Sequence, residues 1–356
     1  MLHAAFDAYL AAENARNTSP SHKRTMADSF KALKAYRPDC PLAEIDFAWL
    51  QTLSGELKAR PLSRKKDART GRRMPIKPYT VRRLLGHLGR ALTWIGRHRE
   101  SKRFGAWCPP SDWRYLCTVE ISDLMSKKEK DKAADGPEQL TIVELVKIYH
   151  AACQSRPRLH PILFLLGLFA GMGQTELSTA TRDEFDLESS TFCHRRNKTS
   201  VRGEYWLPPE LVLRLREYFK EHAVPSGEPV FRNRGGSVLV NNKSDAVGQA
   251  WVDWRKRSGV HRHGLGFYSL RRFWGDYATR VGGPATGDVA LAHTAKSVRE
   301  RHYSGYRDFD SVKAAGQQLH AELTQAGMFT PPPTAIADEE GGTTECTAES
   351  KSANAA

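Results

Sequence analysis

The sequence predicts a mainly α-helical protein of two domains, with one small β-hairpin or sheet in the C-terminal domain. Its 356 residues are enough for two separate cores. Apolar residues recur at helical spacing through most of the chain. The segment 192–208 instead has aromatic and β-branched residues on both sides of a turn, NKTSVRG, which favours a hairpin. A charged segment without periodicity, 125–139, contains a Gly-Pro turn and is the expected linker.

The first domain, residues 1–124, is predicted to be helical. Ser19 and Pro20 mark a helix start. Three helices are expected from apolar residues near helical spacing: Met26, Phe30, Leu33 and Tyr36 in the first, Ile45, Trp49, Leu53 and Leu57 in the second, and Val81, Leu84, Leu85, Leu88, Leu92 and Ile95 in the third.

The most basic part of the chain is the segment 58–83, and its middle, 63–78, is an expected loop because it holds a glycine and two prolines. The third helix continues this charge, since its arginines lie largely off the apolar stripe. A charged helix face is often only solvated, but here it is nearly all positive and adjoins a basic loop. We therefore predict phosphate contacts by Arg64, Lys65, Lys66, Arg72, Arg73, Lys77, Arg82, Arg83 and Arg90.

The charge balance favours a polyanionic partner. The chain has 54 Lys and Arg against 40 Asp and Glu, a net charge of +14, and each phosphate that a basic protein neutralises releases condensed counterions. No apolar run approaches the roughly 20 residues that span a bilayer, and a secretion signal is not evident. Six scattered cysteines without a CxxC pair argue against a zinc site and a disulfide framework. We expect a cytoplasmic protein without membrane contact.

The second domain is expected at 140–328. Thr141 is a plausible helix cap with Glu144 three residues later. The apolar run 159–172 is an expected buried helix, and 208–222 and 311–327 are further helices. From residue 329 onward the composition is that of a disordered tail, 329–356.

Four segments of the second domain resemble the phage integrase, or tyrosine recombinase, family. They are AGMGQTELSTATRDEFDL, similar to the TGLRxSEL helix-turn segment; NKTSVRGEYWLP, similar to the lysine-bearing hairpin; FYSLRRFWGDYAT, similar to the HxLRH box; and LAHTAKSVRERHY, similar to the LGH and tyrosine box. The resemblance covers roughly residues 1 to 325. It implies a two-domain clamp on double-stranded DNA, built from a helical core-binding domain and a catalytic domain.

The resemblance also implies a reaction: DNA recombination or integration through a 3'-phosphotyrosyl link, as in mobile elements. Such enzymes need no metal and no cofactor, and they act as homo-oligomers on paired DNA sites. They often pass a C-terminal helix to a neighbour, although packing of the 311–327 helix within its own chain is an equal expectation.

Five residues match the family's catalytic positions. Tyr303 is the implied nucleophile, with Tyr306 as its competitor; because a free tyrosine has a pKa of about 10, nearby cations must favour the phenolate. Arg271 is implied to hold phosphate oxygens and Lys198 to protonate the leaving 5'-oxygen. His293 and Tyr268 are implied to donate hydrogen bonds to the phosphate, although each is also a common structural residue.

Two positions depart from the family pattern. Tyr268 replaces a histidine, and Gly173 stands where the family has its first arginine. Loss of one preorganised donor to a developing oxyanion costs about a hundredfold to a thousandfold in rate. Other arginines could fill this gap: Arg182, Arg202, Arg262 or Arg272.

The sequence therefore supports three functions. The first is a DNA breaking and rejoining enzyme. The second is a DNA-binding protein on the same scaffold that cleaves slowly or not at all, which Gly173 favours. The third is a helical protein that uses its basic faces for RNA or a protein partner.

Overall fold

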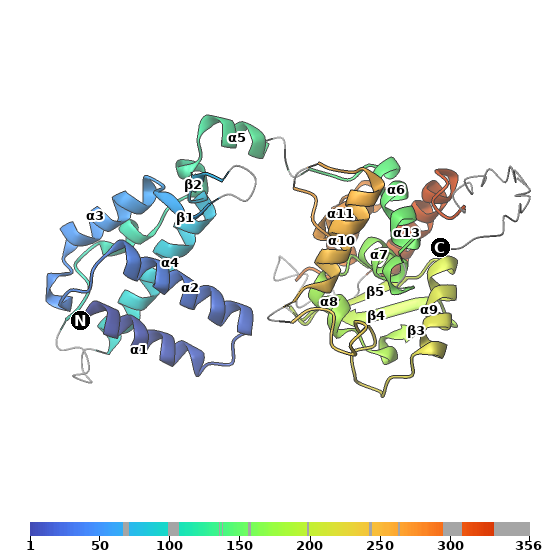
Figure 1. Ribbon diagram of the computed structural model, residues 1–356, viewed down its shortest axis with the longest axis horizontal. Coiled ribbons are helices and arrows are strands. Elements are labelled where there is room, and N and C mark those ends of the chain that lie inside the picture. The colour runs from blue at the N-terminus through green and yellow to red at the C-terminus, as the bar shows by residue number, and fades with distance from the viewer. Residues whose placement is uncertain are drawn as a thin grey trace, which may run out of the picture. The chain divides into compact units, whose positions relative to one another are not determined.

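The computed structural model describes residues 1–66, 71–98, 107–134, 136, 138–155, 158–197, 199–241, 244–262, 264–294 and 308–330. The chain divides into two compact units, Met1–Pro137 and Glu138–Ala356. Within the described residues the structure is mainly helical, with two small antiparallel sheets (Figure 1). The predicted fold class is therefore confirmed. No helix in this described part is long and apolar enough to cross a membrane.

The N-terminal unit is a cluster of helices around one core. Its helices are α1 (Leu2–Asn14), α2 (Pro20–Tyr36), α3 (Phe47–Lys58), α4 (Pro78–Arg97) and α5 (Lys127–Ala134), with short 3₁₀ turns at Leu42–Glu44, Trp113–Cys117 and Ile121–Leu124. Helix α4 packs against α1, α2 and α3. Ser19 caps α2 by accepting from the His22 N–H. All six apolar residues predicted for the stripe of α4 are buried, so this stripe forms the centre of the core.

One sequence prediction for this unit is wrong. The basic segment expected to be a loop forms a hairpin, in which β1 (Leu62–Lys66) pairs antiparallel with β2 (Arg73–Pro75). The expected linker 125–139 contains the helix α5, and Arg60 holds this helix through an ion pair with Glu129 at 2.6 Å. The two prolines that suggested a loop are compatible with the hairpin, because Pro75 ends β2 and Pro78 begins the following helix α4.

The C-terminal unit combines helices with a three-stranded sheet. Its helices are α6 (Ile142–Cys153), α7 (Leu159–Phe169), α8 (Gln174–Thr179), α9 (Pro209–Glu221), α10 (Ala246–Ser258), α11 (Tyr268–Ala290) and α13 (Phe309–Gln325), with a short 3₁₀ turn at Arg182–Glu184, and its strands are β3 (Phe185–Asp186), β4 (Thr191–Arg195) and β5 (Arg202–Trp206). The predicted capping box of α6 is present, since Thr141 and Glu144 each accept a backbone N–H of the other.

The predicted hairpin is confirmed as strands β4 and β5. They pair antiparallel from Thr191 opposite Trp206 to Arg195 opposite Arg202, and β3 adds a third strand beside β4. Phe192 and Tyr205, a cross-strand pair, are both buried. The sheet therefore presents one face to the core, which fixes the register of the hairpin and the place of its turn.

Helix α7 is the buried centre of the unit, as its apolar sequence predicts. Ten of its eleven residues, all except His160, are buried, and α11 packs across it. The crossing is close at Gly167, where a Cβ would come within 2.8 Å of Phe267 Cζ and 2.9 Å of Leu270 Cδ1. This glycine thus permits the approach of α11, which carries Arg271.

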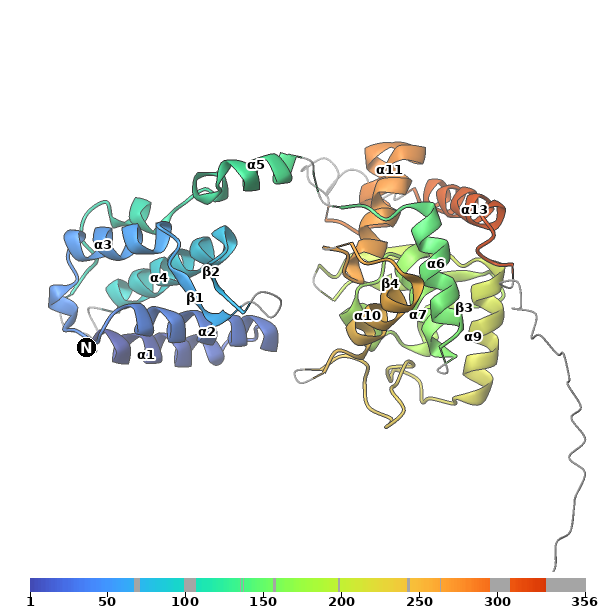
Figure 2. The same cartoon turned by 45° about the horizontal axis from the view of Figure 1, so that its top comes forward.

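Helix α13 packs within its own unit. It lies alongside α11 and contacts β5 (Figure 2), with Val312, Ala315, Leu319 and Leu323 buried. Phe329, which we assigned to the disordered tail, instead contacts the ring of Tyr149 at 5.7 Å between centroids. The folded unit extends at least to this residue, because the aromatic contact orders it; residues 331–356 of the predicted tail lie outside the described chain.

The close crossing at Gly167 gives a stability prediction. Gly167→Ala should lower the free energy of unfolding of the C-terminal unit by about 1–3 kcal/mol, because its methyl group must displace Phe267 and Leu270. Urea denaturation of the full chain measures the loss.

Gly316→Ala is the matched control. It lies inside α13, where a Cβ would meet its nearest neighbour, Trp206, at 3.4 Å. Alanine there should keep or raise stability by about 0.5–1 kcal/mol through helix propensity. Equal effects at both glycines would contradict the close packing of α7 against α11.

Candidate active site

Arg271 joins three of the four segments that the sequence singled out. It lies in the first turn of α11, and its side chain is 2% exposed. Its Nη1 donates to the Gly171 carbonyl at 2.5 Å, and its Nη2 donates to the Leu291 carbonyl. Gly171 follows α7 with φ +58°, and Leu291 stands two residues before His293. Arg271 therefore fixes the turn before α8 and the segment after α11 around one guanidinium.

Several N–H donors of the Arg271 guanidinium are not used by the two carbonyls. An arginine carries five N–H groups, and the two carbonyls use two of those on Arg271. Its Nε is buried and has no hydrogen-bond partner within the described chain. A buried unpartnered donor is costly and calls for an explanation, such as a ligand that the site is built to receive.

Glu176 is the acid at the centre of the site. Its Oε2 accepts the Gly173 N–H at 2.7 Å and lies 4.0 Å from Arg271 Nη1, while its Oε1 accepts Arg196 Nε at 2.9 Å. Burial alone would raise the pKa of this carboxyl. The hydrogen bonds from Gly173 and Arg196, with the charges of Arg271 and Arg196, outweigh burial and hold the pKa below its ordinary value. Glu176 is thus an anion held between two arginines.

Gly173 is the N-cap of α8 and has an ordinary extended backbone, with φ −84° and ψ 170°. A Cβ at this position would have only Glu176 Oε2, at 3.3 Å, within 4 Å among the described residues. The place of the missing side chain is therefore beside the Glu176 carboxylate and is otherwise open.

The four arginines suggested as replacements all have other partners. Arg182 lies over the Phe219 ring and donates to the Phe185 carbonyl. The remaining three have these contacts: Arg202 pairs with Glu204, Arg262 with Glu138 and Glu144, and Arg272 donates to Ser269 Oγ and the Gly264 carbonyl. None of these contacts reaches Glu176.

The arginine that contacts Glu176 from the hairpin is Arg196, which no sequence motif singles out. It follows β4 directly, and its side chain is 14% exposed. Its neighbour Arg195 is exposed and donates to the Ser200 carbonyl instead. Strand alternation turns successive side chains to opposite faces, but the sequence alone does not show which of two adjacent arginines faces α8.

The other predicted site residues are described in part. His293 Nδ1 lies 3.0 Å from Asp288 Oδ1, and the side chains of both are more than a third exposed. Tyr268 is the first residue of α11 and is 48% exposed. Tyr303 and Lys198 lie outside the described residues. The structure therefore brings Arg271 close to the backbone of the His293 segment and places Tyr268 on the surface.

Among the described residues, no cluster of three or more His, Cys, Asp or Glu is placed to hold a metal ion.

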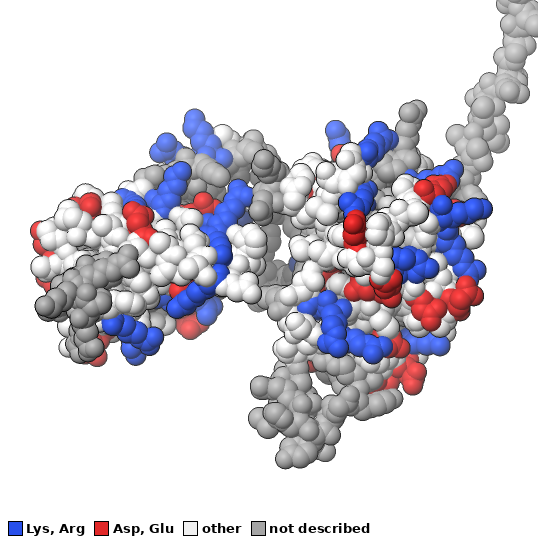
Figure 3. All heavy atoms as spheres, turned by 90° about the horizontal axis from the view of Figure 1, so that it is seen from below, with Lys and Arg blue, Asp and Glu red and all other residues white. Residues whose placement is uncertain are grey.

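A groove in the N-terminal unit collects part of the predicted phosphate-binding set. Arg82, Arg83 and Arg90 line a hollow of about 780 Å³, together with Tyr79 and His22. The exposed residues Lys66, Arg72, Arg73 and Lys77 lie on the β1–β2 hairpin or between it and α4; the side chains of Arg64 and Lys65 lie outside the described set. Figure 3 shows a band of Lys and Arg across this unit.

The positive charge of this groove comes from its arginines. His87 also lines it, but its side chain is buried, and burial together with the charges of Arg90 and Arg83 lowers the pKa of His87 to about 4. The imidazole is therefore neutral at pH 7, and its ring stacks on that of Phe30.

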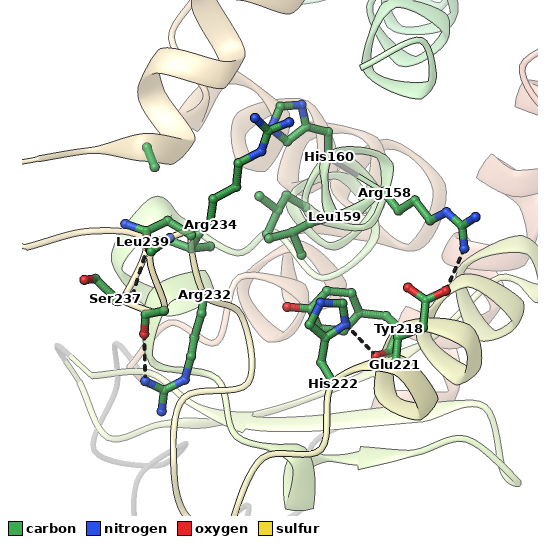
Figure 4. A pocket seen from close by; sticks show the side chains of 15 residues that line it. Arg158, Leu159, His160, Tyr218, Glu221, His222, Arg232, Arg234, Ser237 and Leu239 are labelled. Atoms are coloured by element: carbon green, nitrogen blue, oxygen red, sulfur yellow. Dashed lines mark hydrogen bonds and ion pairs between the residues drawn. The ribbon is translucent and has the colours of Figure 1, made fainter. Parts of the chain in front are cut away.

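A second cavity, of about 1000 Å³, lies in the C-terminal unit away from Arg271. Two arginines that line it are already engaged: Arg158 points to Glu221 at 2.6 Å, and Arg232 donates to the Gly236 carbonyl (Figure 4). No residue of the predicted site lines it.

Solved integrase structures are similar to this chain. A lambda integrase dimer bound to a COC' core site is 16% identical, with a TM-score of 0.57 over 83% of this chain and 95% of that chain. The Tn1549 transposon integrase in complex with transposon right end DNA is 13% identical, with a TM-score of 0.60 over 89% and 99%. No protein-family model and no curated protein sequence matches.

These similarities establish the fold. The chain has the fold of the tyrosine recombinases, as represented by the DNA-bound integrases named above.

The buried anion at Glu176 gives a second prediction. Glu176→Gln should lower the free energy of unfolding by about 3 kcal/mol at pH 7, because Arg196 and Arg271 lose their compensating charge. The pKa of Glu176 lies below the ordinary 4.5. Its contribution is therefore present above pH 4.5 and is lost as the pH falls through the lowered pKa. Urea denaturation across pH 3–7 should show the difference between the two proteins shrinking in acid.

Glu188→Gln is the control, because Glu188 pairs with Arg216 at an exposed site. Its effect should stay within about 0.5 kcal/mol. A loss at Glu176 no greater than this would mean that the carboxylate does not organise the site.

Proposed function

We propose that this chain is a tyrosine recombinase that breaks and rejoins DNA. The Tyr303 phenol gives up its proton to solvent and its oxygen attacks a DNA phosphorus, so that a 3'-phosphotyrosyl bond forms and the bond from phosphorus to the 5'-oxygen breaks. Lys198 donates the proton that the departing oxygen takes up. The 5'-hydroxyl of a second strand then attacks the phosphotyrosyl phosphorus, releases Tyr303 and restores a phosphodiester, so the reaction needs no external energy source.

Arg271 is the observation that carries this proposal. It is buried at the junction of the three segments, within the fold of known integrases, and it keeps donors free after holding two backbone carbonyls. A phosphate oxygen is the acceptor that suits a preorganised, partly satisfied guanidinium. Those donors would stabilise the charge that builds on the phosphorane.

Gly173 supports a second candidate, a DNA-binding protein on this scaffold that cleaves slowly or not at all. The family's first arginine is absent there, and the loss of one such donor costs about a hundredfold or more in rate. Both candidates bind duplex DNA, and they differ in the covalent step alone.

We propose that the two units form a clamp on duplex DNA. The N-terminal unit would contact phosphates through its basic groove and hairpin, and the C-terminal unit would hold the reacting linkage. Lambda integrase has been solved as a dimer on a core site and as a tetramer on a Holliday junction, which favours a homo-oligomer here. The five described cysteines are free thiols, as expected in the cytoplasm.

The covalent step is tested by trapping. Duplexes randomised over 60 base pairs are incubated with the protein, denatured in SDS, and the DNA that stays attached to protein is recovered and sequenced. The wild-type chain should enrich one family of sequences, and Tyr303→Phe should recover none, because it lacks the attacking oxygen.

Tyr306→Phe is the control for the nucleophile and should keep the adduct. If the wild-type protein shifts a duplex in a native gel but never becomes covalently attached to it, the recombinase proposal is contradicted. The second candidate, a DNA-binding protein that does not cleave, would then be favoured. If the adduct is retained in Tyr303→Phe but lost in Tyr306→Phe, Tyr306 is the nucleophile instead of Tyr303.

The groove gives a separate binding prediction. Arg82→Ala should reduce the slope of log K against log salt for duplex binding by about 0.9, because one phosphate contact is lost. Fluorescence anisotropy at several salt concentrations measures this slope. Lys34→Ala removes a charge from the same unit, but Lys34 pairs with Asp7 at 2.6 Å and does not line the groove. An equal change of slope in both variants would rule out a specific role for the groove.

A further inference from the structure

Arg196 binds the carboxylate of Glu176, which lies beside the position of the missing side chain. A side chain on Gly173 would leave the backbone beside Glu176 Oε2, 3.3 Å from its Cβ. Arg196 approaches the same carboxylate from the hairpin and binds its other oxygen, Oε1, at 2.9 Å. The position of the missing side chain and the Arg196 guanidinium thus both adjoin one carboxylate.

Glu176 holds the Arg196 guanidinium through one of its nitrogens, and the other two nitrogens keep their N–H donors. Only its Nε donates to the carboxylate, and its terminal Nη1 and Nη2 have no hydrogen-bond partner within the described chain. The side chain is nevertheless only 14% exposed. A planar fork that is anchored by one nitrogen and open at the other two can grip two oxygens of a phosphate.

The backbone around Arg196 is fixed at the same time. Its N–H donates to the Val201 carbonyl at 3.0 Å, and its carbonyl accepts the Ser200 N–H at 2.7 Å. The next residue, Asn197, donates to Thr179 Oγ1 on α8 at 2.8 Å. The end of β4 is therefore tied to α8 through two side chains, and this limits the motion of the guanidinium.

Arg271 lies on the other side of the same carboxylate. Its Nη1 is 4.0 Å from Glu176 Oε2, while Arg196 holds Oε1. One buried anion is flanked by two cations with free donors, and the surplus of one positive charge suits an added anion.

We infer that Arg196 is a catalytic residue that donates to the reacting phosphate together with Arg271, in place of the side chain that Gly173 lacks. The inference rests on the proposed DNA chemistry. It assigns the second guanidinium to the residue that follows β4, two residues before Lys198 in the sequence.

The test is the rate of covalent attachment, measured on the duplex that the wild-type protein enriches. Arg196→Ala should slow attachment about a hundredfold, with duplex affinity in anisotropy changed by less than about tenfold, since the hairpin is one contact among many. Arg195→Ala, which removes an adjacent exposed arginine, should stay within a few-fold of the wild-type rate.

Two further variants separate chemistry from folding. Arg196→Lys can keep an ion pair with Glu176, so its melting temperature should match wild type while attachment stays at least about tenfold slow, because a lysine lacks the fork. Gly173→Arg combined with Arg196→Ala should recover at least about tenfold of the lost rate, because it returns a guanidinium to the same carboxylate from the other backbone position.

The outcomes are distinct. Wild-type attachment with an unchanged rate in Arg196→Ala would overturn the role of Arg196 and leave the proposed function standing. Loss of attachment in Arg196→Ala without recovery in the double variant, and with a lowered melting temperature, would reduce Arg196 to a structural residue. No attachment by the wild-type protein would remove the proposed function and this inference with it.

Discussion

The site depends on one buried carboxylate. Glu176 holds the start of α8 through the Gly173 N–H, anchors the hairpin through Arg196, and faces Arg271 on α11. A buried anion is tolerated only when it is paired and hydrogen-bonded, and here its partners come from three separate segments. Removing the carboxylate would leave two guanidinium groups close together in a poorly solvated place. The attraction of both guanidinium groups to the Glu176 carboxylate therefore holds these segments together.

The general fold was predictable because local signals and burial agree. The stripe of α4, the capping box of α6 and the apolar run of α7 each appear in the structure as expected. The β1–β2 hairpin was not predictable, because glycine, prolines and charge describe a loop and an exposed hairpin equally well. All three residues of β2 are exposed, so this strand lacks the alternation that reveals a strand.

A candidate site residue could be predicted only where its own sequence segment identifies it, and not where its role depends on a contact with a distant segment. Arg271 could be found because it stands in the segment that resembles the HxLRH box, and its neighbours Leu270 and Phe273 are buried. Arg196 could not, because its role arises from a pairing between a strand end and a helix start that lie 20 residues apart. The one signal available was Glu176, an acid three residues after Gly173, which would need a cation from elsewhere once it is buried.

The most direct measurement is a crystal structure of Tyr303→Phe bound to the duplex that the wild-type protein enriches. The account predicts one phosphate that accepts hydrogen bonds from both Arg196 and Arg271, at about 2.7–2.9 Å, with Glu176 still between the two guanidinium groups. A phosphate held by Arg271 alone, with Arg196 turned to solvent or bound only to Glu176, would contradict it.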